Sequence, residues 1–127
     1  MCALVKDIMT KDVATVSEDA TIKEALDNMR DKNVSSLLVE PRGTRPYGIV
    51  TRWDFINALV LGRRLKEAKV YSIMTSPLIL ATPNLRVEDA AALMSKYGVR
   101  RLPVLKKGEI VGILSNSDIL RYITETD

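Results

Sequence analysis

Two short motifs in this chain carry side chains that could hold a ligand. Thr51-Arg52-Trp53-Asp54 and Ser115-Asn116-Ser117-Asp118 each place a carboxylate three residues after a hydroxyl. An ionised carboxylate can accept two charge-assisted hydrogen bonds, for example from both hydroxyls of a ribose. The hydroxyl, together with the free backbone N–H groups of a helix N-terminus, can face phosphate oxygens. Both motifs therefore fit a ribose phosphate.

The same spacing is also typical of a helix start. A Ser or Thr followed three residues later by an acid resembles a capping box, in which each side chain satisfies a free backbone N–H of the first turn. A duplicated helix start needs a duplicated cap, so the presence of both motifs does not decide between the interpretations. The cap and the ligand site remain alternatives for Asp54 and Asp118.

A pair of arginines offers a second kind of chemistry. Arg100 and Arg101 stand at the start of an expected strand, and their planar guanidinium groups can bind phosphate with two hydrogen bonds each. The corresponding residues in the first half of the chain are Ser35 and Ser36, which can donate hydrogen bonds but carry no charge. The alternative for the arginine pair is a solvated strand start.

Catalysis and metal binding are not expected. The chain has no histidine, the commonest general base and metal ligand, and its one cysteine is Cys2. Ser-His-Asp and Cys-His machinery is therefore impossible, and no Cys pair is available for a metal site. The net charge of +3 suits an anionic ligand but is too small to require nucleic acid. We predict no catalytic residue, no metal and no enzyme activity.

The elements that must position these residues occur twice. Val5-Lys6-Asp7-Ile8-Met9-Thr10 returns 65 residues later as Val70-Tyr71-Ser72-Ile73-Met74-Thr75. Gly48–Asp54 returns 64 residues later as Gly112–Asp118, and the extra residue of the first copy lies within Pro41–Tyr47. A colinear order with one long period indicates a duplication rather than a solenoid.

Each copy predicts a β-α-β-β-α unit. Apolar residues at spacings of three, four and seven predict the first helix of each copy, and Gly98 stands where a left-handed C-terminal cap is expected. The short turn at 106–109 predicts a hairpin. The expected strands are 13–16, 36–40 and 47–51, then 78–81, 101–105 and 110–114; the expected helices are 22–29 and 87–94, with last helices starting near Thr51 and Ser115.

These elements predict the fold class α/β (α+β), with two pseudo-symmetric repeats packed through their sheets into one module. The repeats cover residues 5–60 and 70–124, and a copy of about 60 residues buries too little surface to be stable by itself. The basic linker, residues 61–69, is expected to be solvated, with an anion- or RNA-contacting patch as the alternative.

Composition places the chain among ordinary globular proteins. Of its 127 residues, 46% are hydrophobic and 28% are charged. No apolar run approaches the roughly 18 residues that a membrane span needs. Acidic residues occur too early for a secretory signal. We predict a cytoplasmic protein with no membrane partner.

The ordered motifs, taken together, resemble a known family. The Ile-Met-Thr openings, the Ala-rich helix, Val99-Arg100-Arg101-Leu102-Pro103-Val104 and Gly112–Leu120 are similar to a tandem pair of cystathionine β-synthase (CBS) domains, often called a Bateman module. The resemblance covers Val5 to about Thr124. It extends to the regulatory γ subunit of AMP-activated kinase and to the CBS insert of IMP dehydrogenase.

The resemblance implies a stand-alone regulatory module that binds AMP, ADP or ATP in two clefts between the repeats, without catalysis. S-adenosylmethionine is less expected, because the arginines favour phosphate. In the family each cleft takes its Asp from one repeat and much of its base pocket from the other. The implied residues are Asp54 and Asp118 for the ribose; Thr51, Ser115, Ser117, Ser35, Ser36, Arg100 and Arg101 for hydroxyl and phosphate contacts; and Ala20, Leu85, Val34, Val99 and Trp53 for the base pocket.

Some features depart from the family pattern or leave the partner open. Trp53 directly precedes Asp54 and could stack on a ligand or fill that cleft. The alternative function is a protein or nucleic-acid interaction module whose clefts bind another ligand, such as S-adenosylmethionine, or stay empty. Relatives form dimers, so a homodimer and an unidentified effector protein are expected. The dimer patch could come from either of two apolar sets, Phe55, Leu59 and Leu61 or Ile119, Leu120 and Tyr122.

Overall fold

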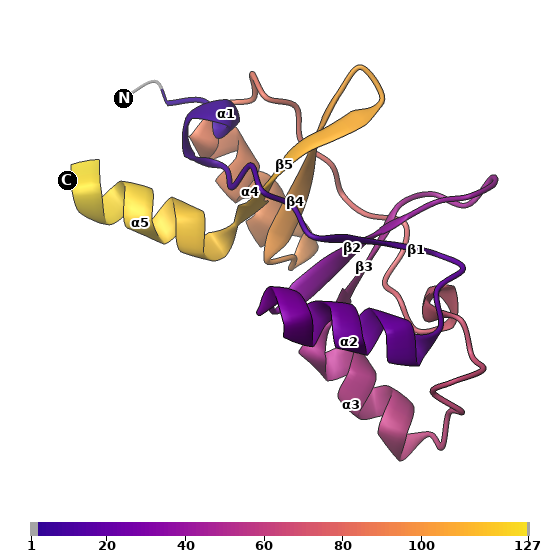
Figure 1. Ribbon diagram of the computed structural model, residues 1–127. Helices are drawn as coiled ribbons and strands as arrows, with labels where there is room; N and C mark the ends of the chain where they lie inside the picture. Colours follow the sequence, from indigo (N-terminus) through magenta and orange to yellow (C-terminus); the bar gives the residue numbers. More distant parts are fainter. Residues whose placement is uncertain (1–2, 127) are drawn as a thin grey trace. The chain divides into compact units, whose positions relative to one another are not determined.

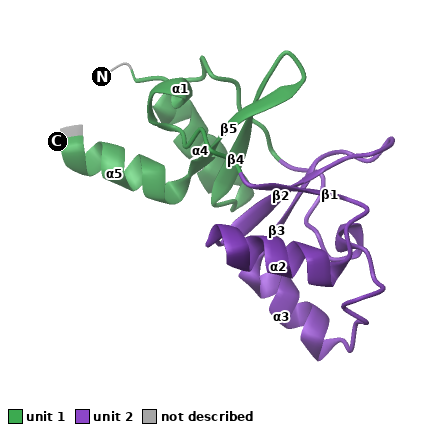
Figure 2. Cartoon of the chain, in the orientation of Figure 1, with its two compact units in different colours: residues 1–13, 79–127 green, residues 14–78 purple. Residues whose placement is uncertain are grey.

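The computed structural model describes residues 3–126 and divides into two compact units (Figures 1 and 2). Unit 1 combines residues 1–13 with residues 79–127, and unit 2 comprises residues 14–78. Unit 2 is therefore inserted in the sequence between two parts of unit 1. This division differs from the two sequence repeats, because the first residues of the chain fold with the second repeat.

Unit 2 contains a three-stranded sheet with strand order β1-β2-β3. β1 pairs parallel to β2, and β2 pairs antiparallel to β3. The buried core lies between this sheet and two helices, with Ile22, Leu37 and Val50 all fully buried. The elements are β1 (Thr15–Ser17), α2 (Ile22–Lys32), β2 (Ser36–Glu40), β3 (Gly48–Thr51), α3 (Arg52–Val60) and the 3-10 turn η1 (Val70–Ser72).

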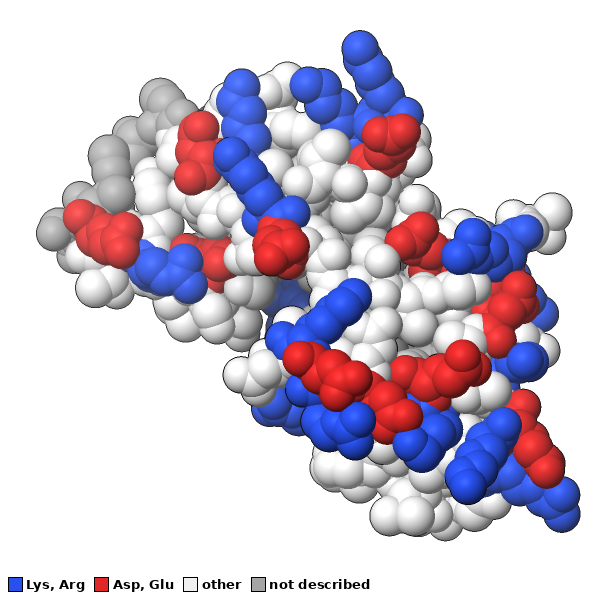
Figure 3. All heavy atoms as spheres, in the orientation of Figure 1, with Lys and Arg blue, Asp and Glu red and all other residues white. Residues whose placement is uncertain are grey.

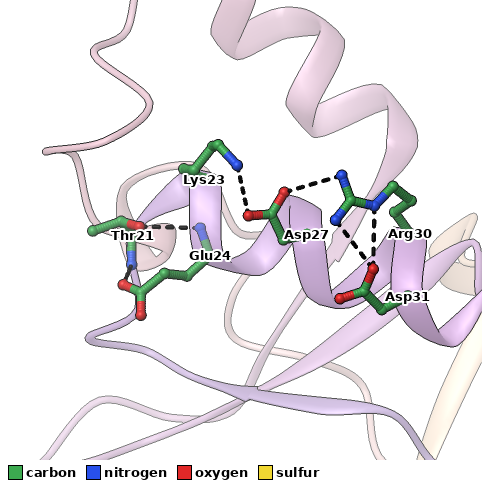
Figure 4. Close-up of polar contacts among 6 residues, drawn as sticks. All are labelled: Thr21, Lys23, Glu24, Asp27, Arg30 and Asp31. Carbon is green, nitrogen blue, oxygen red and sulfur yellow. Dashed lines mark hydrogen bonds and ion pairs between the residues drawn. The ribbon is translucent and has the colours of Figure 1, made fainter.

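Helix α2 shows how local sequence sets an element (Figure 4). Thr21 is its N-cap: Thr21 Oγ1 accepts from the Glu24 N–H at 3.1 Å, and Glu24 Oε1 accepts from the Thr21 N–H at 3.0 Å. The exposed face carries ion pairs, with Asp27 bound by Lys23 and Arg30. At the other end Asn33 adopts the left-handed conformation that ends helices. The predicted helix is confirmed and extends to Lys32.

Unit 1 contains a two-stranded antiparallel sheet, β4-β5, and its own buried core around Val5, Leu102 and Leu114. The predicted hairpin is confirmed: Lys107 and Gly108 both have positive φ, as a tight hairpin turn of matching twist requires. Gly98 is the left-handed cap of α4, as predicted. The elements are α1 (Val5–Ile8), α4 (Val87–Tyr97), β4 (Arg101–Lys106), β5 (Glu109–Ser115) and α5 (Asn116–Thr126).

The predicted strand at residues 78–81 is wrong. Only Ala81 pairs there, through its N–H to the Pro103 carbonyl and its carbonyl to the Leu105 N–H, both at 2.9 Å. Pro103 of β4 has no N–H to donate to the Ile79 carbonyl, whereas its counterpart Leu38 donates to the Ala14 carbonyl of unit 2 at 3.0 Å. Pro83, two residues after Ala81, also has no N–H, so the ladder does not extend. The corresponding strand of unit 2 does form, over Thr15–Ser17 rather than 13–16.

Each Ile-Met-Thr segment pairs with a strand that belongs to the other sequence repeat. Thr10 pairs with Ile113 of β5, and Thr75 pairs with Ile49 of β3, each by two backbone hydrogen bonds of 2.9–3.0 Å. The methionine of each segment lies against a strand glycine. A Cβ placed on Gly112 would come within 2.5 Å of Met9 Sδ, and one on Gly48 would overlap the side chain of Met74. Both strands therefore need glycine at this point.

The linker is more ordered than predicted. Leu65 and Ala68 pack against the core of unit 2, so the expectation of a solvated segment is wrong for them. Their carbonyls accept the N–H groups of Lys23 and Ile22, at 2.8 and 2.9 Å, and so satisfy free donors of the first turn of α2. The basic side chains of the segment are exposed, as predicted: Arg63, Arg64, Lys66 and Lys69.

The predicted apolar patches are only partly exposed. Phe55 and Ile119 are buried in the cores of unit 2 and unit 1, so neither belongs to a surface patch. Leu59, Leu61 and Leu120 are 71%, 71% and 62% exposed. Between residues 3 and 126, no helix is long and apolar enough to cross a membrane.

Candidate functional site

In unit 2 the acidic motif spans the junction between β3 and α3. The Thr51 N–H donates to Asp54 Oδ2 at 2.7 Å, and Thr51 Oγ1 lies 3.3 Å from the same oxygen. Asp54 Oδ1 has no hydrogen bond or ion pair with any described residue, and Asp54 is only half-buried. One carboxylate oxygen thus holds the helix start, and the other remains available as an acceptor.

The other predicted residues of unit 2 lie near this junction or in the core. Ser36 is the register partner of Thr51, so the start of β2 lies beside the end of β3. Val34 and Ala20 are half-buried and pack against the core of unit 2. Trp53 is 66% exposed and belongs to neither core cluster. Its indole therefore provides surface that a partner could contact.

In unit 1 the corresponding junction also forms a capping box. Ser115 N–H donates to Asp118 Oδ2 at 2.9 Å, and the Asp118 N–H donates to Ser115 Oγ at 3.2 Å. The second oxygen, Oδ1, lies 3.4 Å from Thr10 Oγ1 and 3.4 Å from a guanidinium nitrogen of Arg121. Asp118 is only 3% exposed, whereas Ser117 is exposed. The carboxylate is thus held on both oxygens.

The arginine pair lies at the same edge of the unit 1 sheet. Arg101 is the register partner of Ser115, and the Asn116 N–H donates to the Arg100 carbonyl at 2.9 Å. The backbone of the pair is therefore next to the Ser115–Asp118 motif. Leu85 and Val99 are half-buried against the core of the same unit.

The charge of this pair is uncompensated. Within residues 3–126, neither Arg100 nor Arg101 makes an ion pair or a side-chain hydrogen bond. Burial of Arg101, and then the positive charge of Arg100 beside it, lower the pKa of the Arg101 guanidinium. A half-buried cation without an acidic partner is stabilised by an anion, so this edge can receive a negatively charged group.

Sequence reasoning missed two residues that contact Asp118. Thr10 is 108 residues away, and the only signal was that its Ile-Met-Thr segment is repeated. Arg121 follows Asp118 by three residues on α5, a spacing that brings side chains together on a helix. Over the described part of the chain no cluster of three or more His, Cys, Asp or Glu side chains could hold a metal ion.

Comparison with known proteins gives consistent matches over most of the chain. The family model described as "CBS domain" matches residues 5–61 and 70–125. The Bacillus subtilis "CBS domain-containing protein YhcV" is 36% identical over 115 residues, which is 91% of this chain and 81% of that protein. Other relatives are longer: the chain spans 25% of a homoserine O-acetyltransferase from Methanococcus vannielii, at 31% identity.

Solved structures agree in fold. A hexameric CBS-CP12 protein from bloom-forming cyanobacteria superposes with a TM-score of 0.85 at 36% identity, over 100% of this chain and 77% of that one. The CBS domain pair of protein MJ0100, in complex with 5'-methylthioadenosine and S-adenosyl-L-methionine, superposes with a TM-score of 0.84 at 30% identity, over 100% of both chains. The mixed α+β fold with two sheets is thus that of a pair of such domains.

Proposed function

The chain belongs to the CBS domain family, and on this premise we propose that it is a regulatory module that binds an adenosine phosphate and has no catalytic activity. Pairs of CBS domains are regulatory ligand-binding modules, and the pair in MJ0100 is bound to two adenosine compounds. The proposal goes beyond that class by naming AMP, ADP or ATP as the ligand.

The observation that carries the choice of a phosphate is the uncompensated arginine pair of unit 1. Arg101 is half-buried, and its strand partner is Ser115, whose motif supplies a hydroxyl and a carboxylate. Two adjacent guanidinium groups match the charge and planar geometry of a phosphate. S-adenosylmethionine carries no phosphate: its one anionic group is the methionine carboxylate, and its ammonium and sulfonium make it a net cation, so it balances this charge less well than a phosphate does.

The acidic residues supply the proposed ribose contacts. Asp54 has one oxygen without a partner among the described residues, so its carboxylate can hold the helix start and accept a ribose hydroxyl together. The capping box and the ligand site are then compatible interpretations of one side chain. Contacts to the base are proposed at Ala20, Val34 and the exposed indole of Trp53 in unit 2, and at Leu85 and Val99 in unit 1.

An enzyme and a nucleic-acid-binding module are less well supported. The match to homoserine O-acetyltransferase covers a quarter of that enzyme, which leaves most of it outside the similarity. On the face drawn in Figure 3, Lys and Arg side chains of unit 2 are interspersed with Asp and Glu rather than forming a continuous basic surface. Aromatic residues, on which bases would stack, make up only 5% of the chain.

We also propose that the protein acts in the cytoplasm as a homodimer that signals to an effector protein. Helix α3 supports the dimer, because its end exposes apolar side chains that water solvates poorly. These are Ile56, Leu59 and Val60 of the helix and Leu61 directly after it, between 49% and 78% exposed. The hexameric CBS-CP12 protein shows that a relative of this fold assembles. Leu59→Asp should yield monomers in analytical ultracentrifugation, and an unchanged mass would exclude this face.

Titration calorimetry of nucleotide-stripped protein tests the ligand. Parent protein, Arg101→Gln and the control Arg63→Gln, an exposed arginine of the linker, are titrated with AMP, ATP and adenosine. We expect Arg101→Gln to weaken AMP and ATP binding at least tenfold, about 1.4 kcal/mol, and to leave adenosine binding nearly unchanged. Arg63→Gln should behave as the parent.

Three results would contradict the proposal. Parent protein that binds none of the three compounds would exclude an adenosine ligand. Equal weakening for adenosine and AMP would show that Arg101→Gln disturbs the fold rather than a phosphate contact. Tighter binding of S-adenosylmethionine than of any nucleotide would replace the phosphate by the methionine conjugate as the signal.

A further inference from the structure

The two acidic residues of the repeats differ in how many acceptor positions they have left. A carboxylate offers about four lone-pair positions. Asp54 uses two of them, both on Oδ2 and both toward Thr51. Asp118 uses three, one toward Ser115, one toward Thr10 and one toward Arg121, and it is only 3% exposed.

This difference arises at two repeat positions, those of Arg121 and Thr10, whose counterparts in the other repeat do not contact Asp54. The repeat counterpart of Arg121 is Asn57, which carries no charge. The counterpart of Thr10 is Thr75, which has the same hydroxyl but makes no hydrogen bond to Asp54 or to any other described side chain. The free oxygen of Asp54 therefore corresponds to the oxygen of Asp118 that Thr10 and Arg121 occupy.

The backbone of Thr10 is fixed by hydrogen bonds, so its hydroxyl can compete with a ligand hydroxyl for Asp118. Its N–H and carbonyl both bond to Ile113 of β5 at 2.9 Å. Met9, one residue earlier, lies against Gly112, where a Cβ would come within 2.5 Å of its sulfur. The hydroxyl of Thr10 is thus presented to Asp118 by backbone pairing and packing. A ligand hydroxyl that takes its place must displace a side chain anchored to the strand.

We propose that Thr10, with Arg121, restricts access to Asp118 and so makes the two repeats unequal in ribose recognition. This inference rests on the proposed adenosine phosphate function. Asp54 is the acceptor that is ready for a ribose hydroxyl. Asp118 keeps one position, on Oδ2, and its Oδ1 accepts a ribose hydroxyl only when Thr10 or Arg121 gives up its contact. Because binding and displacement are linked, a ligand on Asp118 loosens the N-terminal segment at Val5–Thr10.

The test compares Thr10→Val with the matched control Thr75→Val, both in Asp54→Asn protein so that binding reports on Asp118. Valine has nearly the shape of threonine and lacks the hydroxyl, and both positions are exposed, so folding should be retained. AMP and 2'-deoxy-AMP are titrated into all three proteins. We expect Thr10→Val to bind AMP at least threefold tighter than the Asp54→Asn parent, with a smaller gain for 2'-deoxy-AMP. Thr75→Val should change neither.

The ratio of the two affinities separates recognition from folding, since a folding defect weakens both ligands alike. AMP binding that appears only after Thr10→Val would also support the proposal. If the Asp54→Asn parent binds AMP and Thr10→Val leaves that affinity unchanged or weaker, this inference is overturned. The proposed function would still stand. If the protein with native Asp54 binds no adenosine phosphate, the proposed function and this inference are overturned together.

Amide hydrogen exchange gives a second readout on the same proteins. AMP should speed exchange of the Thr10 and Ile113 amides, which pair with each other's carbonyls. It should leave the corresponding amides of Thr75 and Ile49 unchanged. Exchange at Thr10 that is unaffected or slowed by saturating AMP would overturn the coupling to the N-terminal segment.

Discussion

Unit 1 and unit 2 descend from one repeated pattern, yet they treat the same carboxylate differently. In unit 2 Asp54 is half-buried and has one oxygen unused by the described residues. In unit 1 Asp118 is almost fully buried and contacts Thr10 and Arg121 as well as its own cap. The arginine pair occurs only in unit 1, and unit 2 has Ser35 and Ser36 instead.

A duplicated cap does not give the two carboxylates the same surroundings. The capping contact, a backbone N–H to a carboxylate three residues later, is kept in both units. What differs is the second oxygen, whose partners come from outside the motif. Local spacing thus secures the helix start, and neighbouring segments decide how many acceptor positions the same side chain keeps.

The largest expected effects come from matched core substitutions. Leu37 and Leu102 are repeat counterparts and both are fully buried. Leu37→Ala and Leu102→Ala should each lower the free energy of unfolding by about 2–5 kcal/mol, because each leaves a cavity in its unit's core. Urea unfolding measures the loss, with exposed Leu120→Ala as the control.

Amide exchange on these two variants sharpens the comparison of the units. Protection should fall most in unit 2 for Leu37→Ala and most in unit 1 for Leu102→Ala, since the buried clusters of the two units share no residue. An even loss over both units in each variant would show that the two cores unfold as one.

A somewhat smaller effect is expected at the strand glycines. Gly112→Ala places a methyl group against Met9 and the Thr10 carbonyl, which a Cβ would approach to 3.0 Å. The overpacking should cost about 1–3 kcal/mol, measured by thermal or urea unfolding. Gly43→Ala is the control, because nothing lies within 4 Å of its Cβ. Equal stability of the two variants would contradict the close packing of the N-terminal segment on β5.

The loop between β2 and β3 of unit 2, residues 41–47, is held by a buried carboxylate that unit 1 lacks. Glu18 is 3% exposed and accepts the Arg42 N–H at 2.8 Å, whereas its repeat counterpart is Pro83. Glu18→Ala should cost about 1 kcal/mol, since water can replace the carboxylate at the exposed Arg42.

Exchange of the Arg42 amide would locate the effect of Glu18→Ala. This amide should exchange faster in the variant, and Asp19→Ala, at an exposed neighbour, should leave it unchanged. Unaltered exchange at Arg42 in Glu18→Ala would mean that the loop is held by other contacts, such as the stacking of Arg45 on Tyr71.

The smallest expected effect is an acid sensitivity confined to α2. Hydrogen bonds from the Thr21 backbone and side chain lower the pKa of Glu24 below its usual value of 4.5. Because the folded pKa is depressed, this stabilisation is complete above about pH 4.5 and is lost as the pH falls through the folded pKa.

The midpoints of urea unfolding, measured between pH 3 and 6, test the direction of this pH dependence. Glu24→Gln keeps the acceptor but does not titrate, so it should flatten part of the dependence. The counterpart helix α4 has Arg86 at its N-cap and no side-chain cap hydrogen bond, so it offers no equivalent of this box. A parallel profile for Glu24→Gln and the parent would contradict the role of the Thr21–Glu24 box.

Much of the fold follows from local sequence. The hydrophobic spacing predicted α2 and α4, Gly98 predicted a helix cap, and the turn at Lys107 and Gly108 predicted the β4–β5 hairpin. These features depend on residues within a few positions of one another, so the sequence carries them directly. The strand expected at 78–81 failed because two prolines limit its pairing, Pro83 after the segment and Pro103 in the neighbouring strand β4.

The tertiary structure alone decided where the repeated segments pack. The sequence places Val5–Thr10 in the first copy, yet the segment folds against β5 and brings Thr10 to Asp118, 108 residues away. No periodicity reports such a contact, because it depends on how the N-terminal segment packs on β5 within unit 1. The sequence determined two similar helix starts, each with an acid in place. Packing between distant segments decided that one acid is covered and the other has an oxygen to spare.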